Sequence, residues 1–504
     1  MERSVQVLKF GGTSVGGGER IRRVANIIAH HLQDSGMFPV IVVSAMSDVT
    51  DQLLRIARFA CTGDQEACRQ ELDALKQKHL EGADKAVHKR EGRQALQHDL
   101  QLAFSMLEQD ISAVEAGRIA ATKEAAHENL IAWALHAAPT ISAWGERLSV
   151  LLVAAALRDL GVQAIAVGEE VIITSDLQID TLPSFGTVTG ADPLPQETRV
   201  NARRLIHPLI ERGVVPVAPG FIGRTSRGFI TTLGRNGSDY SATVIGEALD
   251  CVEVTIYSDV DGVLSADPRI VANTRLLPRL SYAEAARLSW FGAKVLHPRT
   301  LIPVAHRNIP VRVRNTFRPH TRGTVVGPEL ATRSAAAAIT VRRQLALITV
   351  ENTDLFGAPE NAGQVFALAA RAGAAPVAIC SSSGHHLAFV VEEQAVDPVI
   401  ALLQHDMGSW RVSHRRGLAV CACIGSGFTA DPMSPARAIT ALARERIPII
   451  TQGASDTGII LIVEESDSER ALRCLHRDLI APVIPLVRHE KQETHEKRRE
   501  VSQI

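Results

Sequence analysis

The sequence is poor in cysteine and in aromatic residues. Its 504 residues contain seven cysteines without a CxxC pair, and only 4% of them are Phe, Trp or Tyr. Few, scattered and odd-numbered cysteines argue against a disulfide framework and a zinc site, and they favour a reducing compartment such as the cytoplasm. Cys421 and Cys423 are expected on opposite faces of one strand, so we predict no metal site there. The scarcity of aromatic rings argues against a platform for stacking nucleic-acid bases.

A net charge of one sign is also missing. Lys and Arg total 54 against 55 Asp and Glu, which gives a formal net charge of −1. Because the protein has no general positive electrostatic field, we expect no nucleic-acid partner and no membrane partner. Any bound anion must then be held by local groups. The chain also lacks a signal-peptide pattern and any run of about 18 apolar residues, so we expect neither a secretory leader nor a membrane span.

What the sequence does contain is aliphatic, with 46% hydrophobic residues, and this favours sheets layered with helices. An apolar run at 5–10, a glycine-rich loop, a helical stretch at 19–32 and an apolar run at 40–43 predict a parallel β-loop-α-β unit. Further apolar runs at 163–167, 214–217, 253–257 and 311–313 continue this α/β sheet, so we predict one domain over residues 1–330. Between about 55 and 138 we predict a helical insertion, whose apolar stripe comprises Leu96, Leu100, Ala103, Leu107 and Ile111.

The region after an alanine-rich stretch at 333–338 has a different pattern. Two segments there share the order strand, loop, helix, strand, hairpin, helix. We interpret them as two ferredoxin-like βαββαβ modules, at 338–412 and 413–487. Tandem modules of this kind either bind small effectors at their interface or function only in subunit assembly, and the sequence leaves both interpretations open. Residues 488–504 are mostly charged and predict a solvated tail.

The first candidate site is the segment KFGGTSV at residues 9–15. Lys9 ends a predicted strand, and Gly11 and Gly12 would let backbone N–H groups approach an anion. The carboxyl ends of strands are where α/β sheets bind ligands, so a phosphate-binding loop is favoured over a plain turn with a solvated lysine. The GxxxxGK[ST] pattern is absent, which excludes a P-loop NTPase.

A second candidate site is the segment TTLGRNGSD at 231–239, which precedes a predicted helix from Tyr240. Ser238 or Asp239 suits the N-cap, and the helix N-terminus adds partial positive charge. Arg235 offers a planar fork for a carboxylate. Taken alone, Asp239 could be no more than a cap.

Three other clusters carry charges next to glycine. The segment SDVDGV at 258–263, with Arg269 beyond it, is either a turn or a holder of ribose or metal-bound nucleotide. Lys294 is a second candidate for a phosphate contact. Glu146, in GERLS at 145–149, would pair with a substrate ammonium or favour the helix dipole. The GxGxxA pattern at 425–430 lies in a module too small for a dinucleotide-binding domain.

These segments, together with VSAMSDVT at 43–50 and FGAKVLHP at 291–298, closely resemble the aspartokinase family. The resemblance runs in order over about residues 3–485, and the family places a tandem pair of ACT modules after its kinase region. It implies transfer of the γ-phosphoryl group of ATP to the side-chain carboxylate of L-aspartate, giving 4-phospho-L-aspartate, the first step of aspartate-family amino acid biosynthesis. A carboxylate is already ionised at pH 7, so this nucleophile needs no general base.

The resemblance also implies roles for particular residues. Lys9 would stabilise the transferred phosphoryl group, and Asp239 would organise the catalytic groups. Aspartate would be held by Thr50, Glu146, Arg235 and Ser238. ATP would contact Lys9, Gly11, Gly12, Ser44, Ser258, Asp259, Arg269 and Lys294, with Mg²⁺ bridging its phosphates and no separate protein metal site.

Some positions depart from the family pattern. Asn236 stands where glycine is usual, although Asn tolerates a left-handed backbone, and Leu264 replaces an aromatic residue beside the nucleotide. Val377 and Ser383 replace two carboxylates that serve the effector site, which puts feedback inhibition by lysine or threonine in doubt. The segment QGAS at 452–455 keeps the pattern in the second module.

Several alternatives remain at this stage. They are a specialised aspartokinase of another pathway, an acetylglutamate, glutamate or carbamate kinase, and a catalytically dead amino-acid sensor. ACT edges usually pair with another copy, so a homodimer or higher homo-oligomer is expected. From the length of 504 residues we expect no fused dehydrogenase domain.

Overall fold

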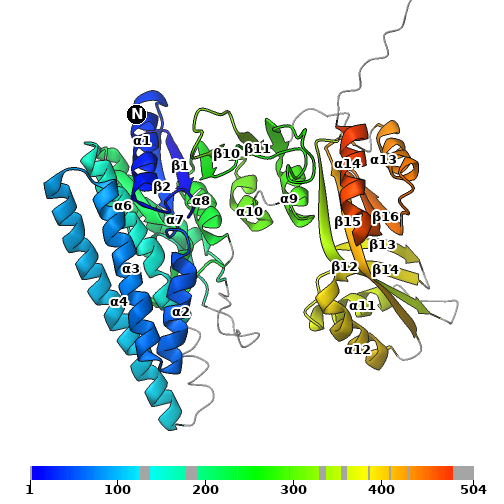
Figure 1. The fold of residues 1–504 in the computed structure, drawn as a ribbon, viewed down its shortest axis with the longest axis horizontal. Helices are drawn as coiled ribbons and strands as arrows, with labels where there is room; N and C mark the ends of the chain where they lie inside the picture. The colour runs from blue at the N-terminus through cyan, green and yellow to red at the C-terminus, as the bar shows by residue number, and fades with distance from the viewer. Residues whose placement is uncertain are drawn as a thin grey trace, which may run out of the picture.

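The computed structural model describes residues 3–124, 137–176, 190–234, 236–293, 296–328, 336–352, 360–383, 386–407, 410–428 and 431–480. The predicted ligands Arg235 and Lys294 and the predicted tail at 488–504 lie outside these residues. Figure 1 shows two regions, an N-terminal one drawn in blue to green and a C-terminal one drawn in yellow to red, with α9 (Tyr282–Trp290) between them.

The N-terminal region is built on an eight-stranded sheet, with the order β3-β5-β2-β1-β8-β10-β11-β9. The strands from β3 to β10 are parallel. The strand β11 runs antiparallel to β10, and β9 runs parallel to β11. Their bounds are β1 Val5–Phe10, β2 Phe38–Val43, β3 Ala164–Ala166, β5 Val215–Pro219, β8 Glu253–Ser258, β9 Arg279–Ser281, β10 Val311–Asn315 and β11 Thr324–Gly327. This confirms the predicted mostly parallel α/β sheet.

Helices cover both faces of this sheet. On one side lie α1 (Gly18–Asp34) and α6 (Trp144–Asp159), which pack on each other, and on the other lie α7 (Pro195–Glu211), α8 (Gly237–Ala248) and α10 (Pro298–His306). The segment Ala137–Asp159 has the length and composition of a membrane span, but 83% of its apolar window is buried inside the protein, as in a core helix.

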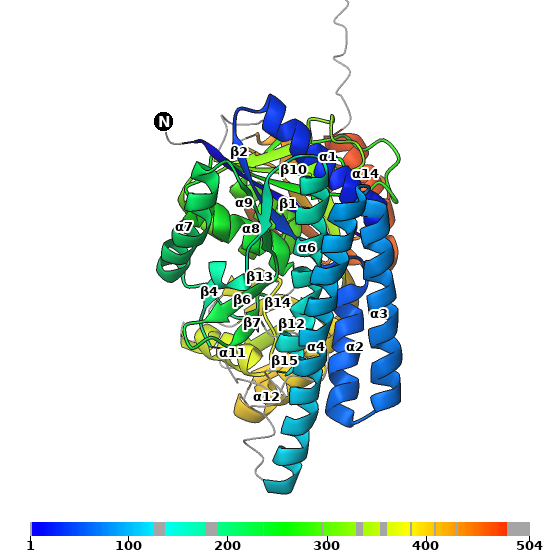
Figure 2. The same ribbon diagram turned by 90° about the vertical axis from the view of Figure 1, so that its left-hand side faces the viewer.

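The predicted insertion is helical. It consists of α2 (Val49–Thr62), α3 (Gln65–Ala86) and α4 (Arg90–Glu124), which extend side by side away from the sheet (Figures 1 and 2). The predicted stripe on α4 is buried, with Leu96, Leu100 and Leu107 at most 1% exposed. The N-terminal region also contains a small second sheet of β4 (Ile173–Thr174), β6 (Ile222–Thr225) and β7 (Ile230–Thr232), which the sequence did not predict.

The C-terminal region contains one six-stranded sheet, with the order β13-β14-β12-β15-β17-β16. Its elements are β12 Ala338–Asn352, α11 Glu360–Arg371, β13 Ala378–Ser383, β14 His386–Glu392, α12 Val396–Asp406, β15 Trp410–Ile424, α13 Met433–Arg444, β16 Thr451–Ser455, β17 Gly458–Glu464 and α14 Ser468–Leu479. The order of helices and strands agrees with two ferredoxin-like modules.

Two long strands connect these modules. Residues 345–352 of β12 pair with β14 and with the first part of β15, whereas residues 338–342 pair only with the second part of β15. Residues 418–424 of β15 pair in turn with β17. Each group of four strands therefore has the ferredoxin-like order, and the fourth strand of the second group comes from the start of β12. The predicted boundary between 412 and 413 falls inside β15.

The expectation that Cys421 and Cys423 face opposite sides was wrong. Both side chains lie in one apolar core with Cys474, because residues two apart on a strand point to the same face. Burial raises the pKa of Cys421 to about 12, so this thiol stays protonated. All seven cysteines of the chain are free.

Candidate functional site

A cavity of about 650 Å³ opens at the carboxyl ends of β1 and β2 and at the N-terminus of α8. This is the edge of a parallel sheet where ligands are expected. Its lining includes seven of the predicted site residues, Lys9, Gly12, Ser44, Thr50, Glu146, Ser238 and Asp239. The structure thus brings together side chains from segments that are far apart in the sequence.

Lys9 and Asp239 form an ion pair inside this cavity. The Lys9 Nζ lies 2.5 Å from the Asp239 Oδ1, and the two side chains are only 9% and 17% exposed. Lys9 is the last residue but one of β1, and Asp239 lies in the first turn of α8. A buried pair at this position is costly to desolvate unless other groups share its charge. An anion that approaches Lys9 would supply such a group.

The helix α8 starts at Gly237, three residues before the predicted start at Tyr240. Its N-cap is Asn236, at φ 57° and ψ 23°, so neither Ser238 nor Asp239 is the cap. Asn is one of the few residues that adopt this left-handed conformation readily, which explains how the loop accommodates it. With the cap moved upstream, Ser238 and Asp239 lie in the first turn, and their side chains are available to the cavity.

Glu146 is buried at the start of α6. Its Oε1 accepts a hydrogen bond of 3.0 Å from the Ala45 N–H, while its Oε2 has no partner among the described residues. Burial raises the pKa of Glu146 to about 8, and the Ala45 bond and the nearby Lys9 only partly oppose this shift. Gly145 allows this close approach, because a Cβ there would lie 2.7 Å from the Ala45 Cβ. A cationic ligand group would satisfy the unpaired oxygen.

Sequence reasoning missed several residues of the loop between β2 and α2 and of the first turn of α2. Ser47, Asp48 and Asp51 also line the cavity. The Ser47 hydroxyl donates to the Gly12 carbonyl at 3.0 Å, and Lys78 of the helical insertion donates to the Ser47 carbonyl at 2.5 Å. The insertion therefore supports the glycine loop from outside. The VSAMSDVT segment contained a signal for Ser47, but nothing in the sequence pointed to Lys78.

Four other predicted nucleotide contacts among the described residues, Gly11, Ser258, Asp259 and Arg269, are not part of the cavity lining. Ser258 is the last residue of β8 and Asp259 follows it directly, and the Gly11 N–H donates to the Tyr257 carbonyl near the end of the same strand. Arg269 is bound by Asp267, and its side chain is 78% exposed. The strand ends thus place Gly11, Ser258 and Asp259 beside Lys9, whereas Arg269 lies on the surface.

Two family models and several known proteins match this chain. Residues 4–315 match the amino acid kinase family, and residues 422–479 match the ACT domain. Aspartokinase 1, chloroplastic, of Arabidopsis thaliana is 30% identical, over 94% of this chain and 79% of its own length. The chain belongs to the aspartokinase family.

Other relatives and solved structures extend the comparison. Bifunctional aspartokinase/homoserine dehydrogenase 2, chloroplastic, of A. thaliana is 34% identical over 93% of this chain, which spans about half (50%) of that relative's length. A crystal structure of E. coli aspartokinase III with aspartate and ADP superposes with a TM-score of 0.73 at 26% identity, covering 94% of this chain and 99% of the other. E. coli aspartokinase III with lysine and aspartate gives a TM-score of 0.71 at 27% identity, with the same coverage.

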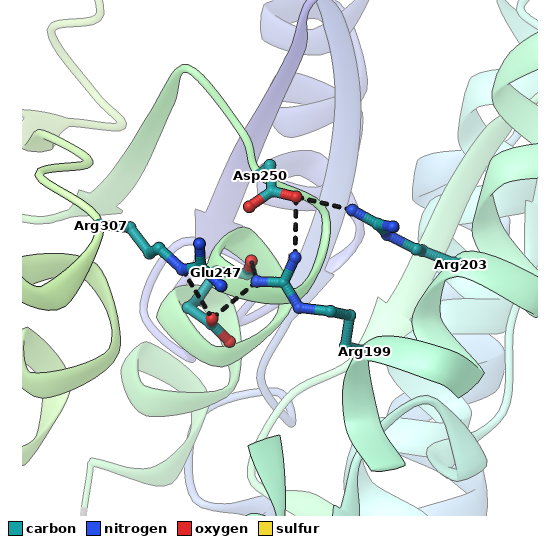
Figure 3. Close-up of polar contacts among 5 residues, drawn as sticks. All are labelled: Arg199, Arg203, Glu247, Asp250 and Arg307. Atoms are coloured by element: carbon teal, nitrogen blue, oxygen red, sulfur yellow. Dashed lines mark hydrogen bonds and ion pairs between the residues drawn. The ribbon is translucent and has the colours of Figure 1, made fainter. Parts of the chain in front are cut away.

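In this aspartokinase fold, a charged network anchors the end of α8 that lies away from the cavity (Figure 3). Arg199 of α7 donates to Glu247 and to Asp250, each at 2.8 Å, and also to the Glu247 carbonyl. Arg203 adds a second contact to Asp250, and Arg307, which follows α10, adds one to Glu247. Cations at a helix C-terminus also favour the helix dipole. The network thus holds the helix whose first turn carries Ser238 and Asp239.

Proposed function

We propose that this protein transfers the γ-phosphoryl group of ATP to the side-chain carboxylate of L-aspartate. The observation that carries the proposal is the cavity in which the Lys9–Asp239 pair faces the unpaired oxygen of Glu146 at a helix N-terminus. A cation and a helix N-terminus suit a phosphoryl group, and a lone carboxylate oxygen suits an ammonium. The named ligands of E. coli aspartokinase III, aspartate and ADP, have these same groups.

The residues of this chain act by binding and neutralisation. Lys9 reduces the repulsion between the aspartate carboxylate and the phosphoryl group, and Asp239 keeps the Lys9 ammonium in place. Glu146 orients the substrate ammonium, and Thr50 and Ser238 offer hydroxyl groups from the cavity wall. Arg235 is proposed for a substrate carboxylate because its planar fork suits bidentate binding.

The nucleotide is proposed to lie along the ends of β1 and β8. Gly11, Gly12, Ser44, Ser258 and Asp259 offer backbone and hydroxyl groups there, and Lys294 is proposed for a phosphate contact. Mg²⁺ usually takes one or two carboxylates together with substrate phosphates, and the Asp239 carboxylate fits that requirement. The described residues contain no cluster of three or more metal-binding side chains, so the ion would be carried mainly by the phosphates. When bound, it would neutralise phosphate charge.

A coupled ADP-release assay with aspartate, glutamate and N-acetylglutamate as acceptors tests the proposal. We expect turnover with aspartate and a hydroxylamine-trapped acyl phosphate, with the other two acceptors at least tenfold poorer in kcat/KM. Turnover with N-acetylglutamate alone would contradict the assignment, because a blocked amine cannot pair with Glu146. Absence of turnover with all three acceptors would favour a catalytically inactive sensor.

We further propose that the C-terminal region divides differently from the sequence-based boundaries. Residues 345–415 would form one ACT module, and residues 338–342 with 418–479 the other, because these are the strand segments that pair. The position expected to hold an effector carboxylate is Val377, which is only 5% exposed and lies in the core. Its backbone carbonyl accepts a hydrogen bond from the Trp290 indole of α9.

Lysine is therefore not expected to inhibit this protein. A lysine side chain has no carboxylate partner at Val377, so millimolar lysine should change neither the turnover nor the melting temperature. Thermal unfolding and initial rates with and without lysine measure this directly. A clear shift in either quantity would mean that other residues bind the effector. Threonine and S-adenosylmethionine can be screened in the same way.

We propose a location in the cytoplasm and assembly as a homodimer. The seven free cysteines suit a reducing compartment. Several relatives carry the word chloroplastic in their names, so a different compartment applies to them. For assembly, β13 and β16 are the edge strands of the six-stranded sheet, and an unpaired edge is a template for pairing with another chain.

A further inference from the structure

The loop that connects β8 to β9 is attached to the second ACT module. This loop follows Ser258, the last residue of β8, and begins with Asp259 and Asp261, in the segment proposed for the nucleotide. It then folds back on itself. The Leu277 N–H donates to the Val263 carbonyl at 2.8 Å, and Leu264 and Leu276 form an isolated bridge. The loop is therefore a small hairpin with two connected arms.

Ser265 is the junction of this hairpin, and it is fully buried. Its N–H donates to the Arg275 carbonyl at 2.8 Å, and its hydroxyl oxygen accepts from the Arg275 N–H at 2.9 Å. Its carbonyl accepts from the Ile339 N–H of β12 at 2.8 Å. Ser265 thus uses its backbone to join both arms of the hairpin to the first strand of the C-terminal sheet.

The Ser265 hydroxyl also contacts the imidazole of His476, on α14 of the second ACT module, at 2.9 Å from the Nε2. His476 is only 5% exposed. Burial, assisted by the neighbouring Arg275, lowers the pKa of His476, so the ring is neutral near pH 7. A neutral imidazole can accept the hydroxyl proton or donate to the hydroxyl oxygen, and either tautomer makes the bond.

Apolar packing connects the same two elements. Ala266 and Val271 of the loop belong to one core cluster with Ile339 and with Leu472 and Leu475 of α14. Apart from Ala336, which precedes β12, the remainder of that cluster comes from the second ACT module. Val263 and Leu277, at the base of the hairpin, belong instead to the core cluster of the parallel sheet, so the loop is packed on both regions. A shift of α14 would therefore be transmitted to the loop.

The helix α9 holds the module in place against the kinase region. The buried carboxylate of Glu284 caps α9 through one oxygen and accepts from the Ser426 N–H and hydroxyl through the other, at 2.7 and 3.0 Å. One turn further along, Arg287 donates to Ser455 and, at 2.7 Å, to Thr457. Within the GxGxxA segment at 425–430, Ser426 is thus a contact between the second module and α9.

We propose that Ser265 and His476 are a positioning pair, through which α14 of the second ACT module holds the loop after β8 in the conformation that receives ATP. The inference rests on the proposed function of this loop and goes beyond it by assigning two residues that do not touch the substrate. Since the pair contacts the loop proposed to bind the nucleotide, its loss should weaken ATP binding and leave aspartate binding nearly unchanged.

Three variants of the full chain test the pair. His476→Leu and Ser265→Ala remove the bond, whereas His476→Gln keeps an amide nitrogen close to the position of the Nε2. We expect the KM for ATP to rise about five- to twentyfold in the first two variants and to recover within about threefold in His476→Gln, with the KM for aspartate changed less than twofold in all three. The double variant His476→Leu/Ser265→Ala should be no worse than either single one. His405→Ala, at an exposed histidine paired with Asp406, is the matched control.

Binding of a non-hydrolysable ATP analogue, measured by titration calorimetry, gives a second readout that needs no turnover. The same five- to twentyfold loss is expected in His476→Leu. Equal rises in both KM values, or unchanged analogue affinity in a folded His476→Leu variant, would overturn the inference while the proposed kinase activity stands. If the wild-type chain binds the analogue but phosphorylates no acceptor, the proposed function fails, and the calorimetric comparison still decides on the pair.

Discussion

The two sheets of this protein differ in where their charged side chains lie. In the parallel sheet, strands end at a common edge, and Lys9, Asp239 and Glu146 are gathered there almost without solvent. In the antiparallel C-terminal sheet, the core beneath the second module is apolar and includes three thiols, and ion pairs such as Arg342–Glu392 lie nearer the surface. Buried charge therefore marks the region that contains the candidate site, whereas the apolar region contacts it through α9 and the loop after β8.

The largest expected effect comes from removing the buried cation. Lys9→Ala should lower turnover on the order of 10³-fold or more, since no other described cation lines the cavity and phosphoryl transfer depends on charge neutralisation. Steady-state kinetics with a thermal unfolding control measure this. The matched variant is Lys76→Ala, at a lysine paired with Glu108 on the helical insertion, and it should retain full activity. Near wild-type turnover in Lys9→Ala would remove the contrast between the two sheets.

The next effect belongs to the apolar core. Phe428 is fully buried in the second module, and Phe428→Ala should lower the free energy of unfolding by about 3–5 kcal/mol through the lost contacts and the cavity left behind. Urea denaturation measures the loss. Met433→Ala, at a residue that is 55% exposed, should cost less than about 1 kcal/mol. If both variants lose the same free energy of unfolding, burial of Phe428 in the core of the second module does not stabilise the protein.

A smaller effect on the free energy of unfolding is expected when Glu146 is replaced, and its size depends on pH. Because the pKa of Glu146 rises from 4.5 to about 8 on folding, the folded state holds the proton more tightly, and stability falls as pH rises between these values. Glu146→Gln removes this term, so its stability relative to wild type should improve by a few kcal/mol between pH 5 and pH 9, at about 1.4 kcal/mol per pKa unit.

Substrate binding provides the second half of that experiment. The wild-type KM for aspartate should fall as pH rises from 6 to 8, because the Glu146 carboxylate must be ionised to pair with an ammonium. In Glu146→Gln the KM should be at least about tenfold higher, since a charge-assisted bond is lost, and should change little over the same range. Parallel pH profiles in the two proteins would exclude Glu146 as the ammonium partner.

The smallest effect is expected at the far end of α8. Arg199→Ala should cost about 1–2 kcal/mol of stability, because Arg199 contacts two carboxylates and a carbonyl in a partly buried site. Arg203→Ala, which loses one exposed contact to Asp250, should cost less than about 0.5 kcal/mol. Denaturant titrations of both variants compare them. Equal costs would mean that burial does not strengthen this network.

Much of the fold and part of the site were predictable from the sequence. The strands of the parallel sheet are continuous apolar runs because both of their faces are covered by helices, and so their limits could be read within one or two residues. Lys9, Glu146 and Asp239 follow from short segments that carry glycine next to a charge. The N-cap residue Asn236 was missed because an N-cap usually has an extended backbone and bonds through its side chain, whereas Asn236 is left-handed and makes no side-chain cap bond.

By itself, the sequence determined the α/β class, the family and the charged groups of the cavity, because periodicity and local motifs are properties of contiguous residues. Only the tertiary structure decided that Lys78 contacts the loop beside Gly12, that residues 338–342 pair with the second part of β15, and that His476 contacts Ser265 in the loop after β8. Each of these joins residues that are distant along the chain and carry no shared pattern. Their proximity depends on how strands pair and how helices pack, and a local motif does not encode it.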